Sequence, residues 1–132
     1  MKNIYTTGDK KTYRKVVTKE DVARFDSGTV HEVYATFALA RDAEWSSRLF
    51  VLDMKDEDEE GIGTFVHINH HAPALIGEEV VFEATLEELK GNTVNCRITV
   101  TAGQRLIATG RTGQKILKKD KIKNLFNTIQ KH

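Results

Sequence analysis

The second half of the chain alternates apolar and polar residues in three consecutive runs. Residues 79–86 place an apolar side chain at every second position, and residues 93–100 repeat the pattern more cleanly. A third run covers residues 106–117. A period of two residues is typical of a half-buried β-strand. Because only short turns at residues 90–92 and 102–104 separate the runs, we expect an antiparallel meander.

The first half of the chain has a different pattern of apolar residues. Between Ala35 and Met54, small and apolar residues recur at helical spacing, which predicts a long helix that lies close against the sheet. Residues 63–70 are rich in β-formers and predict a further strand that is broken near Pro73. We also expect an N-terminal strand over residues 13–17.

Three shorter segments complete the prediction. We expect a short helix over residues 20–25 and an exposed acidic loop over residues 56–60, closed by Gly61. The tail, residues 118–131, carries apolar residues at helical spacing and predicts a terminal amphipathic helix.

These elements predict one α+β domain over residues 1–132, with one long helix packed on an antiparallel sheet of about four strands. The helix covers one face of the sheet. Because the other face is polar and small sheets of this kind often associate through their edges, we also expect a dimer.

Composition excludes several classes of protein. The chain has 20 Lys+Arg against 19 Asp+Glu, a formal charge of +1, which does not fit a polybasic nucleic-acid binder. No stretch approaches the roughly 18 consecutive apolar residues of a membrane span, and the N-terminus lacks the apolar core of a signal peptide. The single cysteine, Cys96, suits a reducing compartment. We therefore expect a soluble cytoplasmic protein without a nucleic-acid or membrane partner.

Two polar residues stand out where the pattern expects covered positions. Thr36 lies at the start of the predicted helix, where it is either an N-cap or a functional hydroxyl. Glu44 lies in the middle of that helix beside Trp45, and it is either an exposed residue paired with Arg41 or Arg48, or a general base.

The spacing of these two residues limits how they could meet. Eight residues separate Thr36 from Glu44, which is about 12 Å along one helix, so they cannot touch within it. Either Thr36 lies on the turn before the helix, or the site gathers residues from two chains. Both arrangements fit a pocket at a dimer interface.

A cluster of histidines ends the predicted strand at residues 63–70. On a strand, His67 and His71 share one face and His70 points to the other, so the three do not converge on one metal ion. We therefore expect no metal site. One histidine at a strand end that faces the helix is suited to general acid–base catalysis or to hydrogen bonding.

The chain ends with a basic segment. From Arg111 onward seven Lys or Arg residues accompany a single acid, Asp120. This pattern indicates either a solvated helix face or attraction of a phosphorylated ligand.

Three ordered motifs carry a resemblance to a known family. They are VYAT at residues 33–36, AEW at residues 43–45 and GIGTFVHINHHA at residues 61–72. In these motifs the chain resembles the hotdog-fold acyl-CoA thioesterases, in particular the fluoroacetyl-CoA thioesterase-like family. The likeness extends from about Val33 to Lys123.

The resemblance implies a fold, a reaction and a site. It implies the hotdog fold, in which an antiparallel sheet is wrapped around one long central helix. It also implies a homodimer or dimer of dimers that hydrolyses a small or medium acyl-CoA without a cofactor. By motif the catalytic set is Thr36, Glu44 and His70, with the acyl-CoA held in a pocket between two chains. The substrate-binding residues implied by the matching positions are Gly63, Thr64, His71, Arg111 and Gln114.

The sequence also departs from the family pattern. His71 stands where the family has a threonine, and Gln114 stands where it has an arginine. The lid that precedes Thr36 reads Gly28-Thr29-Val30 in place of bulky residues, so we expect no selectivity for fluoroacetyl-CoA. Two alternatives follow: an acyl-CoA-binding sensor without activity, and a hydratase or dehydratase on the same fold.

Overall fold

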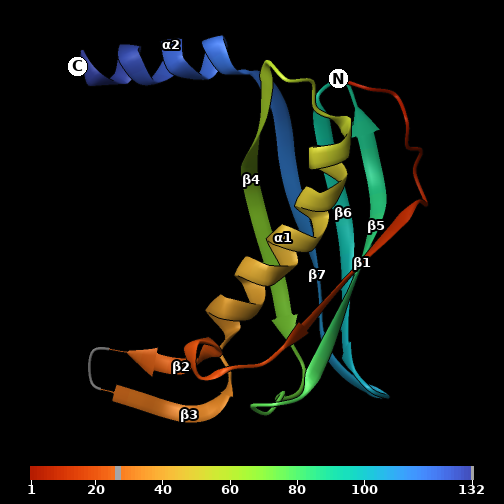
Figure 1. The fold of residues 1–132 in the computed structure, drawn as a ribbon, viewed down its shortest axis with the longest axis vertical. Helices are drawn as coiled ribbons and strands as arrows, with labels where there is room; N and C mark the ends of the chain where they lie inside the picture. Colours follow the sequence, from red (N-terminus) through yellow and green to blue (C-terminus); the bar gives the residue numbers. More distant parts are fainter. Residues whose placement is uncertain (26–27, 132) are drawn as a thin grey trace.

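A five-stranded antiparallel sheet forms the body of the protein (Figure 1). The computed structural model describes residues 1–25 and 28–131. The strand order is β1-β5-β6-β7-β4, so β5, β6 and β7 form the predicted meander. The strands are β1 (Lys10–Val16), β4 (Glu59–His70), β5 (Glu79–Lys90), β6 (Thr93–Ala102) and β7 (Arg105–Lys118).

The long helix α1 (Thr36–Met54) lies across one face of this sheet, as the sequence predicts (Figure 1). Its small-residue stripe allows a close approach. A Cβ added at Gly61 on β4 would lie 2.5 Å from a methyl carbon of Val51 on α1, so only glycine fits there. The stripe residues that are buried against the sheet are Ala43, Ser47, Phe50, Val51 and Met54.

A small second sheet precedes α1. The predicted helix over residues 20–25 is wrong, since a single 3₁₀ turn η1 (Lys19–Asp21) leads into strand β2 (Val22–Phe25). β2 pairs with β3 (Gly28–Tyr34), which the sequence analysis did not predict. Cross-strand hydrogen bonds with residues further along the chain decide this local structure.

The predicted acidic loop is shorter than expected. β4 begins at Glu59, so Glu59 and Glu60 are part of a strand. Glu59 is buried because the N-terminal amine of Met1 lies 2.8 Å from its carboxylate. An ion partner from the other end of the chain therefore brings a charged residue into the sheet.

Two features lie at the edge of the sheet beyond β7. β4 pairs only with β7, so its other edge is unpaired within the described chain, and Phe65 and Val66 on it are 44% and 38% exposed. The terminal helix α2 (Lys119–Gln130) extends past β4, away from the body of the protein (Figure 1). No helix in the described residues is long and apolar enough to cross a bilayer.

Candidate active site

Thr36 and His70 meet at one end of β4. Ala35 is the N-cap of α1 and Thr36 is the first helical residue, so the interpretation of Thr36 as an N-cap is wrong. Its Oγ1 instead lies 3.0 Å from Nδ1 of His70, the last residue of β4. This pair borders a cavity of about 350 Å³, and the other residues that line it are Val33, His71, Ala72 and Pro73. A hydroxyl and an imidazole therefore lie within hydrogen-bond distance of each other at the mouth of a cavity.

The second ring nitrogen of His70, Nε2, lacks a hydrogen-bond partner among the described residues. This nitrogen is also buried. A buried unpaired ring nitrogen costs free energy and is typical of a site that completes itself with a ligand or a further group.

Glu44 lies two turns further along α1, above β4. A Cβ added at Gly63 would be 2.5 Å from Oε1 of Glu44. The carboxylate therefore lies directly against the backbone of Gly63, in the space that any other side chain would occupy. The expected pairing with Arg48 is not formed, because Arg48 donates to Glu60 at 2.7 Å and to the carbonyl of Gly61 at 3.1 Å. The half-buried Glu44 is therefore held against the strand, and no cation among the described residues pairs with its carboxylate.

The Glu44 side chain borders a second cavity. Its volume is about 320 Å³, and its lining is Arg41, Glu44, Trp45 and Arg48. Trp45 is 41% exposed, so a large aromatic surface stands open beside the carboxylate.

Gln114 supports the helix beneath Glu44. It is 1% exposed, and its Nε2 donates to Oγ of Ser47 at 3.1 Å and to the main-chain carbonyl of Glu44 at 3.5 Å. In the ladder between β4 and β7 it lies opposite Gly63. This placement favours a role in positioning Glu44, whereas the sequence suggested direct substrate binding.

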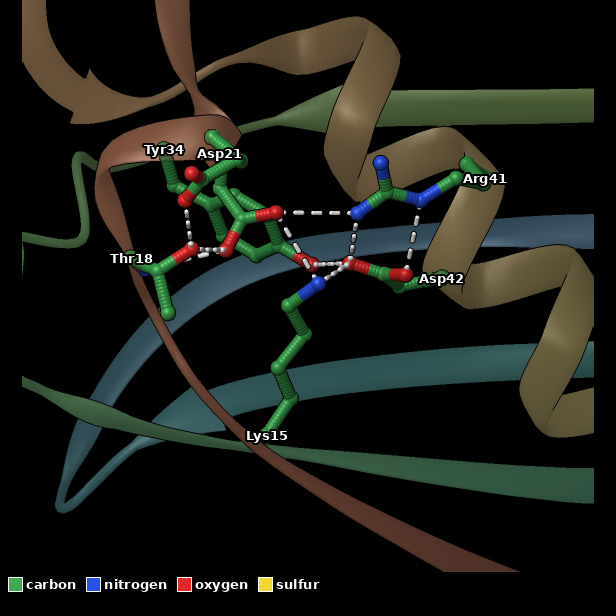
Figure 2. Close-up of polar contacts among 7 residues, drawn as sticks. Lys15, Thr18, Asp21, Tyr34, Arg41 and Asp42 are labelled. Carbon is green, nitrogen blue, oxygen red and sulfur yellow. Dashed lines mark hydrogen bonds and ion pairs between the residues drawn. The ribbon is translucent and has the colours of Figure 1, made fainter.

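A buried polar cluster fixes the start of α1 (Figure 2). Asp21 accepts hydrogen bonds from Nζ of Lys15 at 2.9 Å, from Arg41 at 2.9 Å and from the backbone of Thr18 at 2.9 Å. Burial by itself raises the pKa of Asp21, but the bonds from Thr18, Lys15 and Arg41 outweigh it and lower the pKa to about 2.

Asp42 is the second carboxylate of this cluster. It binds Lys15 at 3.0 Å and Arg41 at 3.0 Å, and it accepts a hydrogen bond from the hydroxyl of Tyr34. Burial and the neighbouring Asp42 carboxylate raise the pKa of Tyr34, so this hydroxyl stays protonated and acts as a donor.

The cluster lies one residue from the candidate site. The main-chain carbonyl of Asp21 accepts from the N–H of Ala35 at 2.7 Å, directly before Thr36. Asp21 thus holds the helix start through its backbone and through the Arg41 side chain. No sequence pattern indicates these residues in advance, because they come from β1, η1, β3 and α1 and share no motif.

Of two further predicted residues, Arg111 lies away from these two groups and His71 borders the cavity of the first. Arg111 pairs with Glu87 at 2.9 Å, beside His67 on the face of the sheet opposite α1. His71, by contrast, borders the same cavity as Thr36 and His70, and its Nε2 lies 2.8 Å from Oγ1 of Thr109, whereas His67 lines a different cavity beside Arg111. The structure does not bring Arg111 to Thr36 or Glu44.

Thr64 and the lid segment before Thr36 are two further positions that the sequence assigns to the site. Thr64 is exposed where the register between β4 and β7 shifts, a bulge of the kind that often occurs beside active sites. The side chains of Thr29 and Val30, in the expected lid, lie outside the described part of the chain.

Within one chain the candidate residues form two separate groups. Thr36 and Glu44 are both in α1, about 12 Å apart along its axis. Gly63 beneath Glu44 and His70 beside Thr36 are seven residues apart on β4, or about 23 Å. The hydroxyl–imidazole pair and the carboxylate therefore lie at different points along the same edge strand, β4, whose outer edge is unpaired within the described chain.

Comparisons with known proteins agree with this architecture. The family described as fluoroacetyl-CoA-specific thioesterase matches residues 17–120. A hypothetical protein of Thermus thermophilus, described as a thioesterase superfamily member, is 38% identical and superposes with a TM-score of 0.90, covering 96% of this chain and 93% of that one. No curated protein matches.

More distant structures share the fold alone. The fluoroacetyl-CoA thioesterase FlK is 20% identical, with a TM-score of 0.86 over 94% of this chain and 96% of that one. A hot-dog-like protein of Thermanaerovibrio acidaminovorans is 19% identical, with a TM-score of 0.84 over 92% and 90% of the two chains. The predicted hotdog fold is confirmed.

The family match covers most of the chain and includes all three motifs, from VYAT through GIGTFVHINHHA. The chain therefore belongs to the fluoroacetyl-CoA-specific thioesterase family, and it is a thioester hydrolase of the hotdog fold that acts on acyl-CoA.

Proposed function

We propose that the protein is a homodimeric thioesterase that hydrolyses a small or medium acyl-CoA with Thr36, Glu44 and His70. One observation carries the proposal. The Thr36–His70 pair and the Glu44 carboxylate lie at separate points along β4, an edge strand whose outer edge is unpaired within the described chain. A second copy can bring the two groups together.

The edge strand limits how that copy is placed. Two copies of β4 that pair antiparallel about a two-fold axis put the start of one strand beside the end of the other. If Gly63 faces the partner's His70, the axis passes between Val66 and His67. The exposed Phe65 and Val66 then lie at the centre of the interface, where apolar surface is covered.

Each dimer then has two sites with shared chemistry. Glu44 of one subunit removes a proton from water, or attacks the thioester carbonyl itself, and the carbonyl oxygen gains negative charge. The Thr36 hydroxyl and His70 imidazole of the partner subunit donate hydrogen bonds to that oxygen or protonate the departing CoA sulfur. Where water attacks, the carbon–sulfur bond breaks and releases the carboxylate and free CoA. Where Glu44 attacks, the same bond breaks to release CoA and leaves a mixed anhydride on Glu44, which a water molecule then hydrolyses to the free carboxylate and the restored Glu44.

The resemblance and the basic tail support CoA as the carrier. The exposed lysines after Arg111 offer cations for the phosphates of CoA. The sequence Gly28-Thr29-Val30, in place of the bulky residues of the family's lid, supports a substrate without fluoroacetyl selectivity. A cytoplasmic location, where CoA is abundant and Cys96 stays reduced, is part of the same proposal.

The test is a thiol-release assay over acyl-CoA esters of increasing chain length. We expect Glu44→Gln and His70→Ala each to lower kcat about a hundredfold, the usual contribution of a positioned acid–base group. His67→Ala is the matched control, because His67 lies on the same strand but faces the opposite side of the sheet. It should retain the parental rate.

Two results would contradict the proposal. Parental rates in both site variants would remove Glu44 and His70 from the chemistry. Tight binding of acyl-CoA without release of thiol from the parental protein would instead support the sensor, and formation of an enoyl or hydroxyacyl product would support the hydratase.

A further inference from the structure

The terminal helix α2 has an uncovered apolar face. Leu125, Phe126 and Ile129 are 50%, 54% and 63% exposed, and together with Ile122 they lie on one side of the helix. No residue of α2 is buried. Apolar side chains gathered on one helix face are expected to lie against another apolar surface.

The chain's own body does not supply that surface. The backbone of Lys119 donates to the carbonyl of Asp58 at 2.8 Å, which ties the start of α2 to the start of β4. From there α2 projects beyond β4, on the side where the sheet has no further strand (Figure 1).

A matching apolar surface lies at the other end of β4. Leu75 and Ile76, in the loop after that strand, are 53% and 41% exposed. The same loop contributes Ala72 and Pro73 to the Thr36–His70 cavity. The strand from Glu59 to His70 is about 36 Å long, so α2 cannot reach this loop within its own chain.

A two-fold axis through the middle of β4 places the start of β4 in one subunit beside the end of β4 in the other. This step depends on the homodimer of the proposed function. With Gly63 opposite the partner's His70, the start of β4 extends past the end of the partner's β4, on the side where the partner's loop with Leu75 and Ile76 follows. The 12 residues of α2 span about 18 Å, several times the ~4.8 Å between neighbouring strands, so the helix reaches over the partner's loop.

We propose that α2 of each subunit packs its apolar face on the partner's Leu75–Ile76 loop and covers the mouth of the partner's Thr36–His70 cavity. Each subunit then contributes Glu44 and a helical cover to the partner's site. The occupant of the uncovered face of α2 is a second copy of this chain.

The charges on α2 fit this position. Lys121 and Lys123 flank the apolar face, and both are exposed. On the partner, the exposed Glu32 of β3 lies next to Val33, which pairs with Leu75. The lysines of α2 thus lie within reach of an acidic residue and of the phosphates of a CoA molecule that enters the covered cavity.

Engineered cysteines test the contact without relying on activity. Leu125→Cys combined with Leu75→Cys should form a disulfide between subunits under mild oxidation, visible as a covalent dimer on a non-reducing gel. Cys96 gives little background, because burial raises the pKa of its thiol to about 12. Phe126→Cys with Ile76→Cys provides a second pair that samples the neighbouring turn.

The matched control is Asn127→Cys with Leu75→Cys. Asn127 is adjacent in sequence to Phe126 but lies on the opposite side of α2, so this pair should remain largely uncrosslinked. Closing the disulfide should also slow acyl-CoA turnover about tenfold by holding the cover in place, and a reductant should restore it.

The oligomeric state separates the possible failures. A protein that is dimeric by light scattering but gives no covalent dimer with either pair would overturn the proposal for α2 and leave the dimeric site intact. Cross-links that join dimers into larger species would also overturn it. A monomeric protein with full thioesterase activity would contradict both the proposed site and the role of α2.

Discussion

Gly63 has no side chain, and the space that a Cβ would fill contains the Glu44 carboxylate. Gly63→Ala places a methyl group 2.5 Å from Oε1 of Glu44, so the carboxylate must move. Because a displacement of about 1 Å can cost a hundredfold in rate, we expect kcat to fall by ten- to a hundredfold. The thermal midpoint should change little.

A double variant isolates the mechanism. If Gly63→Ala acts by moving Glu44, it should have little further effect on kcat in a Glu44→Gln background. Full additivity of the two losses would show that Gly63 contributes by a separate route, such as its own backbone N–H.

At this scale the sequence identified residues but not their contacts. Thr36, Glu44 and His70 were found from short motifs, and the contact of Thr36 with His70 at 3.0 Å agrees with a shared role. Gln114 was placed with the substrate, but packing against Ser47 buries it. Burial depends on what lies above a strand, which strand periodicity alone does not specify.

At the scale of elements, the Asp21 cluster joins β1, η1, β3 and α1 at one point (Figure 2). Four elements that are separate in sequence are thereby held at the residue that precedes Thr36. Buried ion pairs are costly to break singly, because the partner charge is left without compensation. The start of α1 is therefore an anchored part of the fold.

Asp21→Asn should destabilise the protein in a pH-dependent way. The pKa of Asp21 is about 2 in the folded state, below its usual 3.8, so its charge stabilises the fold above pH 4 by about 2 kcal/mol. That contribution is lost as the pH falls from about 4 through about 2. The free energy of unfolding from urea titrations at several pH values measures it.

The difference between parent and variant should be large at pH 7 and shrink toward pH 2. Asp120→Asn, at an exposed carboxylate in α2, is the control and should alter stability little at either pH. A constant difference for Asp21→Asn across this range would show that its charge is not what stabilises the cluster.

At the scale of the whole molecule, the shared site predicts complementation between inactive variants. One subunit carries Glu44→Gln and the other His70→Ala. In the mixed dimer, one site receives both substitutions and the other receives none. Unfolding and refolding an equal mixture should restore about a quarter of the parental activity, because half of the dimers are mixed and each has one intact site.

A site contained within one chain gives the opposite result. Both sites of a mixed dimer would then contain one substitution, and activity would stay at the level of the separate variants. A mixture of Glu44→Gln with His67→Ala measures the yield of refolding, since His67 lies outside the proposed site.

The sequence by itself determined the periodic elements and the motif residues. The strands β5, β6 and β7 and the helix α1 follow from alternation and helical spacing, because those patterns depend on which face of each element is buried. The motifs at Thr36, Glu44 and His70 are local, so they can be read without knowing the fold.

Only the tertiary structure decided what those residues touch. The strand pairing of β2 with β3, the burial of Glu59 by the N-terminal amine and the ion cluster at Asp21 all join segments far apart in the chain. Such contacts are set by packing and desolvation in three dimensions, and no local pattern encodes them.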